Sequence, residues 1–316
     1  MKKVLAIVIT VCMLMAFVPC ISFAAETTLT ASNMAFFTPS GTLSSLEGSG
    51  ESGGSCVLVA WNGTDNWNGA STFTDSDGTE VTQSISGSGF GSSRQAVVSF
   101  DIPADLNTET DIKVTLGLTV RFIKQINEAG ARLAIYGNSV DGTWTTATDK
   151  STFGVSGSDS GTGNLPLLGL TTPVSMAGGN QVDQTVTLSS VKLAEYVKDM
   201  AKEGKSQVTF RVAVPHGGMW IYNSTSSHPA TLKVEEGTLT TVKVKTVLMD
   251  GINYVWEEEK VINNVISGST YTYTEAIEPV IELNEWDEQG VFVYSEEDST
   301  LSTVVEADGT SEIVLV

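Results

Sequence analysis

An unbroken alternation of apolar and polar residues over 112–122 constrains the fold of this chain more than any other feature. Every even-numbered position in the stretch is apolar, and every odd-numbered position is polar or glycine. Successive side chains of a β-strand point to opposite faces of a sheet, whereas a helix places every third or fourth residue on one face. The stretch is therefore predicted to be one long strand, with one face on a hydrophobic core and the other in water.

The same two-residue period recurs in shorter stretches along the chain. Strands that alternate in this way indicate antiparallel sheets with a solvated face. Their Gly- and Ser-rich connections favour two sheets packed as a sandwich. We therefore expect an all-β fold: an antiparallel, jelly-roll-like β-sandwich over residues 26–237 and a small acidic β module over 238–316. The apolar positions of the shorter stretches are Ala96, Val98, Phe100 and Ile102; Val208, Phe210, Val212 and Val214; and Leu232 and Val234.

One short helix is predicted within the sandwich. Ser190 is a typical N-cap residue, and Gly204 is a typical residue to end a helix. Between them the apolar residues fall on one stripe, which we expect to contact the core. The stripe consists of Val191, Leu193, Ala194, Val197, Met200 and Ala201.

The N-terminus has the three-part pattern of a secretory signal peptide. Lys2 and Lys3 form a basic head, residues 4–18 are apolar, and residues 22–25 offer a small-residue cleavage site. The apolar run is shorter than the ~20 residues of a bilayer span, which disfavours a membrane anchor. Cys20 lacks the small preceding residues of a lipoprotein site. The sequence therefore predicts export to the cell surface or the medium, with residues 1–25 removed and no membrane span left.

The chain is strongly acidic. Its net charge is −20, and loss of the two leader lysines makes it −22. Such a surface repels phosphate backbones, so we expect no nucleic-acid partner; it suits solubility, a negatively charged cell envelope or cation binding. Only Cys56 remains after cleavage, which rules out an intrachain disulfide, and its apolar neighbours predict a buried thiol. With only His216 and His228, a multi-histidine zinc site is impossible, and a Ser-His-Asp triad would have to use one of these two.

A loop with two tryptophans is the first candidate binding site. Sugars present apolar C–H faces and hydroxyl groups, so a binder combines aromatic platforms with amides and carboxylates. Residues 61–68 supply both kinds of group. The alternative is that the tryptophans fold back into the core, because tryptophan is mostly buried in proteins. The predicted ligand-binding residues of this loop are Trp61, Asn62, Asp65, Asn66 and Trp67.

A second candidate patch follows His216. Trp220 and Tyr222 would share one face of an extended strand, and Asn223 would add an amide beside them. The patch is therefore predicted to bind a glycan together with the first loop. The alternative is an aromatic pair that packs the sheet through cross-strand contacts.

A cluster of carboxylates suggests one cofactor, calcium. Asp75, Asp77 and Glu80 surround the turn residue Gly78. Calcium takes six to eight oxygen ligands, many of them carboxylates, but the spacing matches an EF-hand loop only in part. A solvated turn is the alternative.

No catalytic motif has the structural context that its chemistry requires. Residues 48–54 match both G-x-S-x-G and G-x-G-x-x-G, but neither match lies between a strand and a helix, so the tract is predicted to be a loop. Residues 257–259 are three glutamates, which we expect on a solvated edge. The carboxylate pair of a glycosidase is defined by separation in space, so a polysaccharide lyase or glycosidase stays an alternative.

The tail is the most acidic part of the chain. Residues 238–316 hold 16 acidic and 3 basic residues, a balance of −13. Hairpin turns are predicted at Asp250-Gly251 and Asp308-Gly309. Short strands are predicted at residues 242–244, 271–273, 291–294, 302–305 and 313–316.

Several elements of the larger domain follow one another in an order that resembles a known family. They are the run at 94–102, the long alternating strand, Trp144 after Asp141-Gly142, the helix before 208–212, and the closing stretch 229–234. Over about residues 92–234 this order resembles the DNRLRE-type β-sandwich, related to carbohydrate-binding module family 96. The resemblance implies a sandwich of the kind found in secreted bacterial polysaccharide-degrading and surface proteins. The residues before 92 depart from the opening strand of that family.

The tail is similar to the mucin-binding-protein repeat (MucBP) of Gram-positive surface proteins. The similarity rests on residues 242–245, 268–273, 294–305 and 308–314 and covers about residues 240–316. It implies a module that serves as a stalk element as much as a binder.

Three functions are compatible with the sequence. A non-catalytic carbohydrate-binding or adhesion protein would hold a glycan on aromatic and amide side chains. A polysaccharide-degrading enzyme, or an accessory part of one, would release reducing ends or unsaturated products. A structural stalk would bind no glycan and would belong to a longer protein with further domains, since the chain stops within an apolar stretch at Val316.

Overall fold

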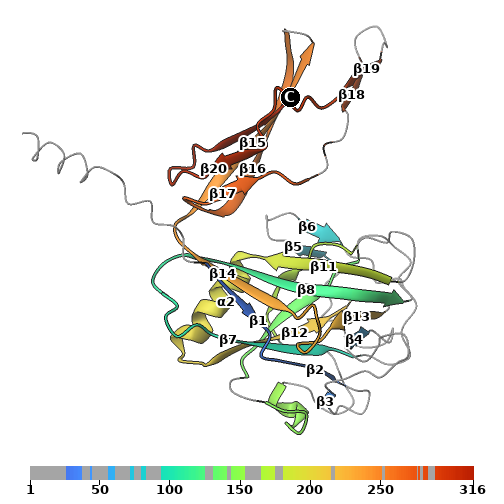
Figure 1. Ribbon diagram of the computed structural model, residues 1–316, viewed down its shortest axis with the longest axis vertical. Coiled ribbons are helices and arrows are strands. Elements are labelled where there is room, and N and C mark those ends of the chain that lie inside the picture. Colours follow the sequence, from blue (N-terminus) through green and yellow to red (C-terminus); the bar gives the residue numbers. More distant parts are fainter. Residues whose placement is uncertain are drawn as a thin grey trace, which may run out of the picture. The chain divides into compact units, whose positions relative to one another are not determined.

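The computed structural model describes residues 26–37, 43–44, 56–60, 72–74, 80–82, 94–124, 131–140, 144–153, 165–174, 181–214, 218–250, 253–275, 277, 280–283 and 289–316 (Figure 1). Two compact units account for them, Glu26–Leu239 and Thr240–Val316. The predicted leader lies outside the described residues. Within these ranges no helix is long and apolar enough to cross a membrane.

The first unit contains a six-stranded sheet built around the long strand that the sequence predicts. This strand is β8 (Ile112–Lys124). The strand β11 (Gln181–Ser189) pairs with one edge of β8, while β14 (Thr231–Glu236) and β13 (Gly218–Tyr222) share its other edge. The sheet is completed by β1 (Glu26–Thr30), which pairs with β14, and β4 (Cys56–Ala60), which pairs with β13. Every pairing is antiparallel, as predicted.

The first and last strands of this unit are neighbours. In the pairing of β1 with β14, Glu26 lies opposite Glu235, so the beginning of one strand meets the end of the other. Lys233 joins the two strands here, because its ammonium group lies 3.1 Å from a carboxylate oxygen of Glu26 and 3.1 Å from one of Glu235.

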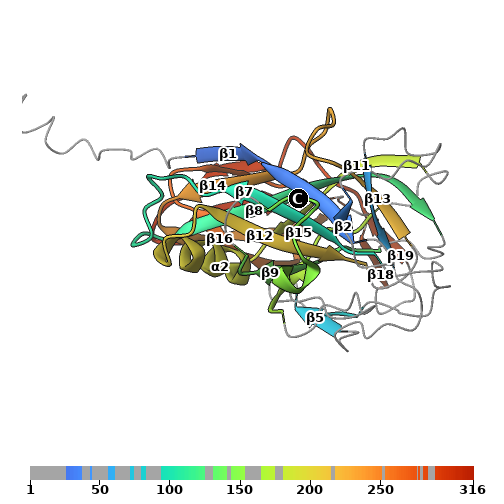
Figure 2. The same cartoon turned by 90° about the horizontal axis from the view of Figure 1, so that it is seen from below.

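The second sheet of the unit also has six strands. Their order across the sheet differs from their order in the chain, and all described pairs are antiparallel. Across the sheet they are β10 (Leu167–Leu170), β9 (Ala134–Asn138), β12 (Gln207–Ala213), β7 (Ala96–Asp101), β2 (Asn33–Phe37) and β3 (Leu43–Ser44). Figure 2 gives a second view of the strands.

One hydrophobic core lies between the two sheets. Leu116 and Leu118 of β8 belong to the same buried cluster as Val98 and Phe100 of β7 and Phe210 of β12. The predicted positions Ala96, Val208, Val212, Val214, Leu232 and Val234 lie in this cluster as well, while Ile102, just after the end of β7, is only partly buried and packs against it. The prediction of an all-β sandwich is confirmed.

The prediction of a solvated face is wrong for the second sheet. Val97 points away from the main core, yet it is fully buried in a second cluster with Phe37, Trp144 and Phe153. The segment 144–153, which ends in the short 3-10 helix η1 (Lys150–Phe153), supplies the last two of these side chains. A segment without a two-residue period thus covers the part of the outer face that β2 and β7 form.

The alternation within β8 also stops one residue earlier than predicted. On β13, Trp220 lies opposite Phe122 but Ile221 lies opposite Val120, so Arg121 is an extra residue. An extra residue of this kind moves every following side chain to the opposite face. Phe122 therefore leaves the main core for the outer face of the sheet, and Ile123 takes the core side.

The predicted helix is α2 (Val191–Lys202). Its N-cap is Ser190, whose Oγ accepts a hydrogen bond from the Leu193 amide at 3.1 Å. Gly204 follows the helix with φ +75°, a left-handed conformation that glycine adopts without strain. Most of the apolar stripe is buried, namely Leu193, Ala194, Val197 and Met200, but Val191 is 47% exposed and does not join the core.

The second unit is built on a three-stranded sheet. Its order is β16 (Asn253–Ile266), β15 (Leu239–Asp250) and β21 (Glu312–Leu315), with β21 parallel to β15. Val242 and Val244 of β15 pack with Val265, Ile313 and Leu315 in the core of the unit. Two strand pairs complete it, β17 (Thr270–Thr272) with β20 (Ser302–Val304) and β18 (Val280–Leu283) with β19 (Gln289–Phe292). The first unit also holds the pair β5 (Thr72–Thr74) and β6 (Glu80–Thr82).

The predicted tail strands are confirmed, with one turn corrected. Asp308 and Gly309 form a turn, but they connect β20 to β21, which belong to different sheets, so this is not a hairpin. Asp250 ends β15 and the next described strand, β16, is its neighbour; Gly251 lies outside the described residues. Residues 257–259 are exposed on the edge strand β16, as predicted.

Candidate functional site

The first predicted binding loop and the predicted calcium cluster fall largely outside the described residues. Trp61, Asn62, Asp65, Asn66 and Trp67 belong to the segment that begins directly after Ala60, the last residue of β4. For calcium, Asp75 and Asp77 likewise lie outside, and Glu80 is described only as the first backbone position of β6. Across the described ranges, no group of three or more His, Cys, Asp or Glu side chains could hold a metal ion.

The second predicted patch lies on the outer face of the first sheet. Trp220 and Tyr222 share this face, as predicted, because Met219 and Ile221, which alternate with them along β13, point into the core. Trp220 is only 4% exposed, and its ring packs edge-on against Phe122 with the ring centroids 5.4 Å apart. Trp220 therefore forms the cross-strand aromatic contact that was the alternative to a binding platform.

Asn223 lies inside the structure. The residue is only 2% exposed. Its Oδ1 accepts hydrogen bonds from the amide of Thr225 at 3.1 Å and from the Thr225 hydroxyl at 2.9 Å. An asparagine that bonds two residues ahead in this way stabilises a turn. The structure thus gives the Asn223 amide a turn-forming role in place of the surface position that the sequence suggested.

Tyr222 lies at the rim of the patch and is the centre of a polar cluster. Its hydroxyl donates a hydrogen bond to Oδ1 of Asp183 at 2.9 Å. The guanidinium carbon of Arg121 lies 5.6 Å from the centre of the Tyr222 ring, and the His228 ring lies 4.9 Å from it at an angle of 39°. We call these four residues, Arg121, Asp183, Tyr222 and His228, the Tyr222 cluster.

Two irregularities of the sheet bring the cluster together. Gln181 of β11 pairs with Phe122 of β8 and Gln184 pairs with Val120, so two residues of β11 face the single residue Arg121. One of these two is Asp183, which has φ +42°, a left-handed conformation that costs free energy for any residue but glycine. Bulges of this kind redirect side chains, and they are common beside functional sites.

Burial sets the protonation of the two weak acids near the cluster. It raises the pKa of Tyr222, and the hydrogen bond to Asp183 raises it further, against an opposing effect of Arg121. Burial likewise raises the pKa of the Cys56 thiol, which is fully buried as predicted, although Arg121 partly opposes this shift. At neutral pH the phenol is therefore a hydrogen-bond donor, and the thiol is an uncharged core group.

The Tyr222 cluster offers hydrogen-bonding groups rather than an open aromatic surface. The ring of Tyr222 is in contact with Arg121 and His228, whereas the guanidinium, carboxylate, phenol and imidazole groups lie together on one face of the sheet. Guanidinium groups donate, carboxylates accept, and neutral imidazole does both. Such a set can bind a ligand that carries several hydroxyl groups.

The sequence alone misses most of this cluster. Asp183 lies 39 residues from Tyr222, and neither Arg121 nor Asp183 belongs to a motif. One signal was present, because Phe122 and Ile123 are consecutive apolar residues that end the alternation just after Arg121. Such a break is typical of a β-bulge.

The chain was compared with models of known protein families and with curated proteins. No model of a known protein family matches the chain, and no curated protein matches it either. The function therefore has to be inferred from the sandwich and the Tyr222 cluster.

Proposed function

We propose that this chain is an exported, non-catalytic carbohydrate-binding or adhesion protein. Its sandwich would hold a glycan on the Tyr222 cluster and on the tryptophan loop that follows Ala60, while the acidic C-terminal unit would space the sandwich from a surface or a partner. The observation that carries the proposal is Asp183, a residue in a left-handed conformation that directs its carboxylate at the Tyr222 hydroxyl on an outer sheet face.

The chemistry of the cluster suits a saccharide. Each hydroxyl of a sugar is a donor and an acceptor, so it can bond a carboxylate and a guanidinium at the same time. Hydrogen bonds to charged groups contribute about 1.5–3 kcal/mol each, roughly twice the contribution of neutral ones. Asp183 and Arg121 supply one group of each sign beside Tyr222.

The scaffold under the cluster favours binding without rearrangement. Arg121 and Tyr222 lie on adjacent paired strands, and Trp220 and Phe122 pack beneath the same face. Groups held by packed strands lose little conformational entropy when a ligand binds. The Trp61–Trp67 loop would add apolar contact to the C–H faces of the sugar.

Export and a cell-surface location complete the proposal. They are supported by the N-terminal pattern of residues 1–25 and by the resemblance to secreted sandwich and Gram-positive surface modules. The proposed partner is a polysaccharide or other glycan, with no nucleic acid and no membrane span in the exported chain. Calcium stays a candidate cofactor at Asp75, Asp77 and Glu80.

Glycan binding by cluster variants tests the proposal. The exported chain is screened on a glycan array, and the dissociation constant for the best ligand is then measured for Asp183→Asn and Arg121→Gln. We expect at least a tenfold weaker affinity for each, because a charge-assisted hydrogen bond is lost. Asp199→Asn on the exposed side of α2 is the matched control and should bind like the parent chain.

Two outcomes would contradict the proposal. Unchanged affinity in a variant that combines Asp183→Asn and Arg121→Gln with Trp61→Ala and Trp67→Ala would remove both parts of the site. Release of reducing ends or unsaturated products from the bound polysaccharide would show turnover, and the enzyme alternative would then replace a purely binding role.

A further inference from the structure

The C-terminal unit presents a long strand edge. The strand β16 is the outermost member of the sheet β16-β15-β21, and no described strand lies beyond it. An edge strand carries backbone N–H and C=O groups that can pair with an added strand. The edge of β16 is therefore a surface to which an extended polypeptide could add.

Side chains along this edge are open on both faces of the sheet. Each residue from 257 to 261 is exposed, although successive residues point to opposite faces. Val261 is an apolar member of the run and is 43% exposed. An incoming strand would thus find backbone groups, charged side chains and one apolar contact within a single stretch.

The charge of the edge indicates which partner fits. All three lysines of the unit are already in ion pairs, whose nitrogen–oxygen distances are 3.1 Å for Lys243–Glu259, 2.8 Å for Lys245–Glu312 and 2.8 Å for Lys260–Glu275. The tail contains 16 acidic residues, so most carboxylates have no lysine of the unit to pair with. Glu258 is an exposed member of this surplus on β16 itself, and Glu257 beside it is also exposed, although it interacts electrostatically with Lys245, which is already paired with Glu312.

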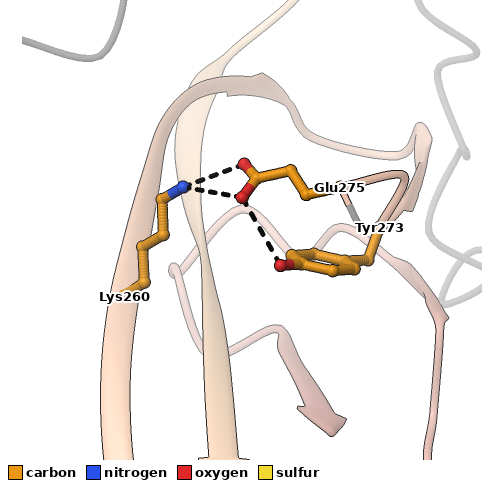
Figure 3. Close-up of polar contacts among 3 residues, drawn as sticks. All are labelled: Lys260, Tyr273 and Glu275. Atoms are coloured by element: carbon orange, nitrogen blue, oxygen red, sulfur yellow. Dashed lines mark hydrogen bonds and ion pairs between the residues drawn. The ribbon is translucent and has the colours of Figure 1, made fainter. Parts of the chain in front are cut away.

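The one lysine on β16 is fully engaged. Figure 3 shows Lys260 directed at both carboxylate oxygens of Glu275, at 2.8 and 3.1 Å, with the Tyr273 hydroxyl 3.4 Å from one of the same oxygens. This contact ties the segment after β17 to β16. It also leaves the charge that the edge presents to a partner negative.

From this geometry we infer that β16 is a docking edge for an extended partner segment in which lysine or arginine alternates with β-branched residues. Opposite charges directly across two strands stabilise the pairing, and like charges oppose it. The three consecutive glutamates therefore disfavour pairing with a second copy of β16 and favour a cationic strand. The inference does not depend on the Tyr222 cluster.

Peptide binding with an exchange readout tests this inference. The exported chain is titrated with a peptide of about nine residues, a typical strand length, in which lysine alternates with valine and threonine. A peptide with glutamate in place of each lysine is the matched probe. We expect binding of the lysine peptide alone, with slower hydrogen–deuterium exchange of the amides in residues 257–263.

Charge reversal on the edge then locates the site. The variant Glu257→Lys/Glu258→Lys should bind the lysine peptide at least tenfold more weakly and should bind the glutamate peptide better than the parent chain does. The control Glu296→Lys/Glu297→Lys makes the same change of charge in the exposed turn before β20 and should keep most of the affinity. Equal loss in both variants, binding without protection of β16, or no binding of the lysine peptide would each overturn the inference.

Discussion

Arg211 of the sandwich and the lysines of the C-terminal unit hold positive charge in opposite environments. In the sandwich, Arg211 on β12 is 0% exposed, donates to the carbonyl oxygen of Phe153 at 3.2 Å and to the Gln95 side chain, and lies 5.3 Å from the centre of the Phe37 ring. In the C-terminal unit all three lysines form ion pairs on surface side chains, two of them between neighbouring strands and one, Lys260, with Glu275 in the segment after β17. The buried charge of Arg211 holds a covering segment against the sandwich, whereas the lysines of the smaller unit are paired on its surface.

This difference in the environment of positive charge follows from how the second sheet of the sandwich and the three-stranded sheet of the C-terminal unit are covered. Segment 144–153 lies on the outer face of the second sheet, where Nδ2 of Asn33 donates to the carbonyl oxygen of Trp144 at 2.7 Å and the Trp144 indole donates to Oγ of Ser99 at 2.6 Å. Buried polar groups must be paired, and removing one partner costs more than the pair contributes. The sheet of the smaller unit carries its ion pairs on exposed side chains, where they are worth at most about 1 kcal/mol.

Removing the buried charge should give the largest effect. We expect Arg211→Ala to lower the free energy of unfolding of the sandwich by about 3–5 kcal/mol, because it leaves buried acceptors unpaired and opens a cavity. The surface counterpart Lys243→Ala should change the stability of its unit by less than about 1 kcal/mol. Urea unfolding followed by tryptophan fluorescence measures the first, and similar losses for the two variants would break the comparison.

Among the described residues, one non-glycine residue in each unit has a left-handed conformation, Asp183 in the sandwich and Asn264 in β16. Glycine at either position relieves strain but adds freedom to the unfolded chain, so each variant should change stability by no more than about 1 kcal/mol. Only Asp183→Gly should weaken glycan binding, by at least tenfold, as measured by titration of the best array ligand. A stability loss well above this range for Asp183→Gly would assign the residue a structural role instead.

The smallest effect is expected from an exposed turn of the C-terminal unit. Hydrogen bonds from the hydroxyl and amide of Thr310 lower the pKa of Asp308 below its usual 3.8. A lowered folded-state pKa stabilises the fold above the unfolded-state value, and this contribution is lost as the pH falls through the folded-state value. Asp308→Ala should therefore reduce the melting temperature slightly at pH 7 and have no effect near pH 2. A difference that persisted in acid would show that the charge is not the cause.

Much of the sandwich could be predicted because its core strands are periodic. The long strand β8, the capped helix α2 and the buried Cys56 all depend on neighbours in the sequence, and each is confirmed, although the alternation in β8 holds only up to the bulge at Arg121. The two-residue period of a strand cannot show which irregular segment of the chain covers the outer face of its sheet. The burial of Val97 depends on Phe153, more than 50 residues away in the chain, so a solvated face was expected there.

The candidate site was predictable only in part, for a related reason. Strand geometry alone predicts that Trp220 and Tyr222 share a face. It does not predict that Trp220 is buried while Tyr222 lies at the rim, because this difference depends on the contact of Trp220 with Phe122. Phe122 reaches that face only through the extra residue Arg121. The extra residue Arg121 therefore explains why Phe122 was wrongly predicted to lie in the main core. It also explains why the Tyr222 cluster contains a guanidinium group.

The antiparallel neighbours β1 and β14 determine how the sandwich responds to mechanical load. Because Glu26 lies opposite Glu235, a pull applied through the two ends of this unit acts at one end of the strand pair. The ladder hydrogen bonds lie across the strands, along the direction of such a pull. These hydrogen bonds would therefore break one after another, instead of bearing the load together as they do in shear. The ion pairs of Lys233 with Glu26 and Glu235 lie at the loaded end and would be among the first interactions to break.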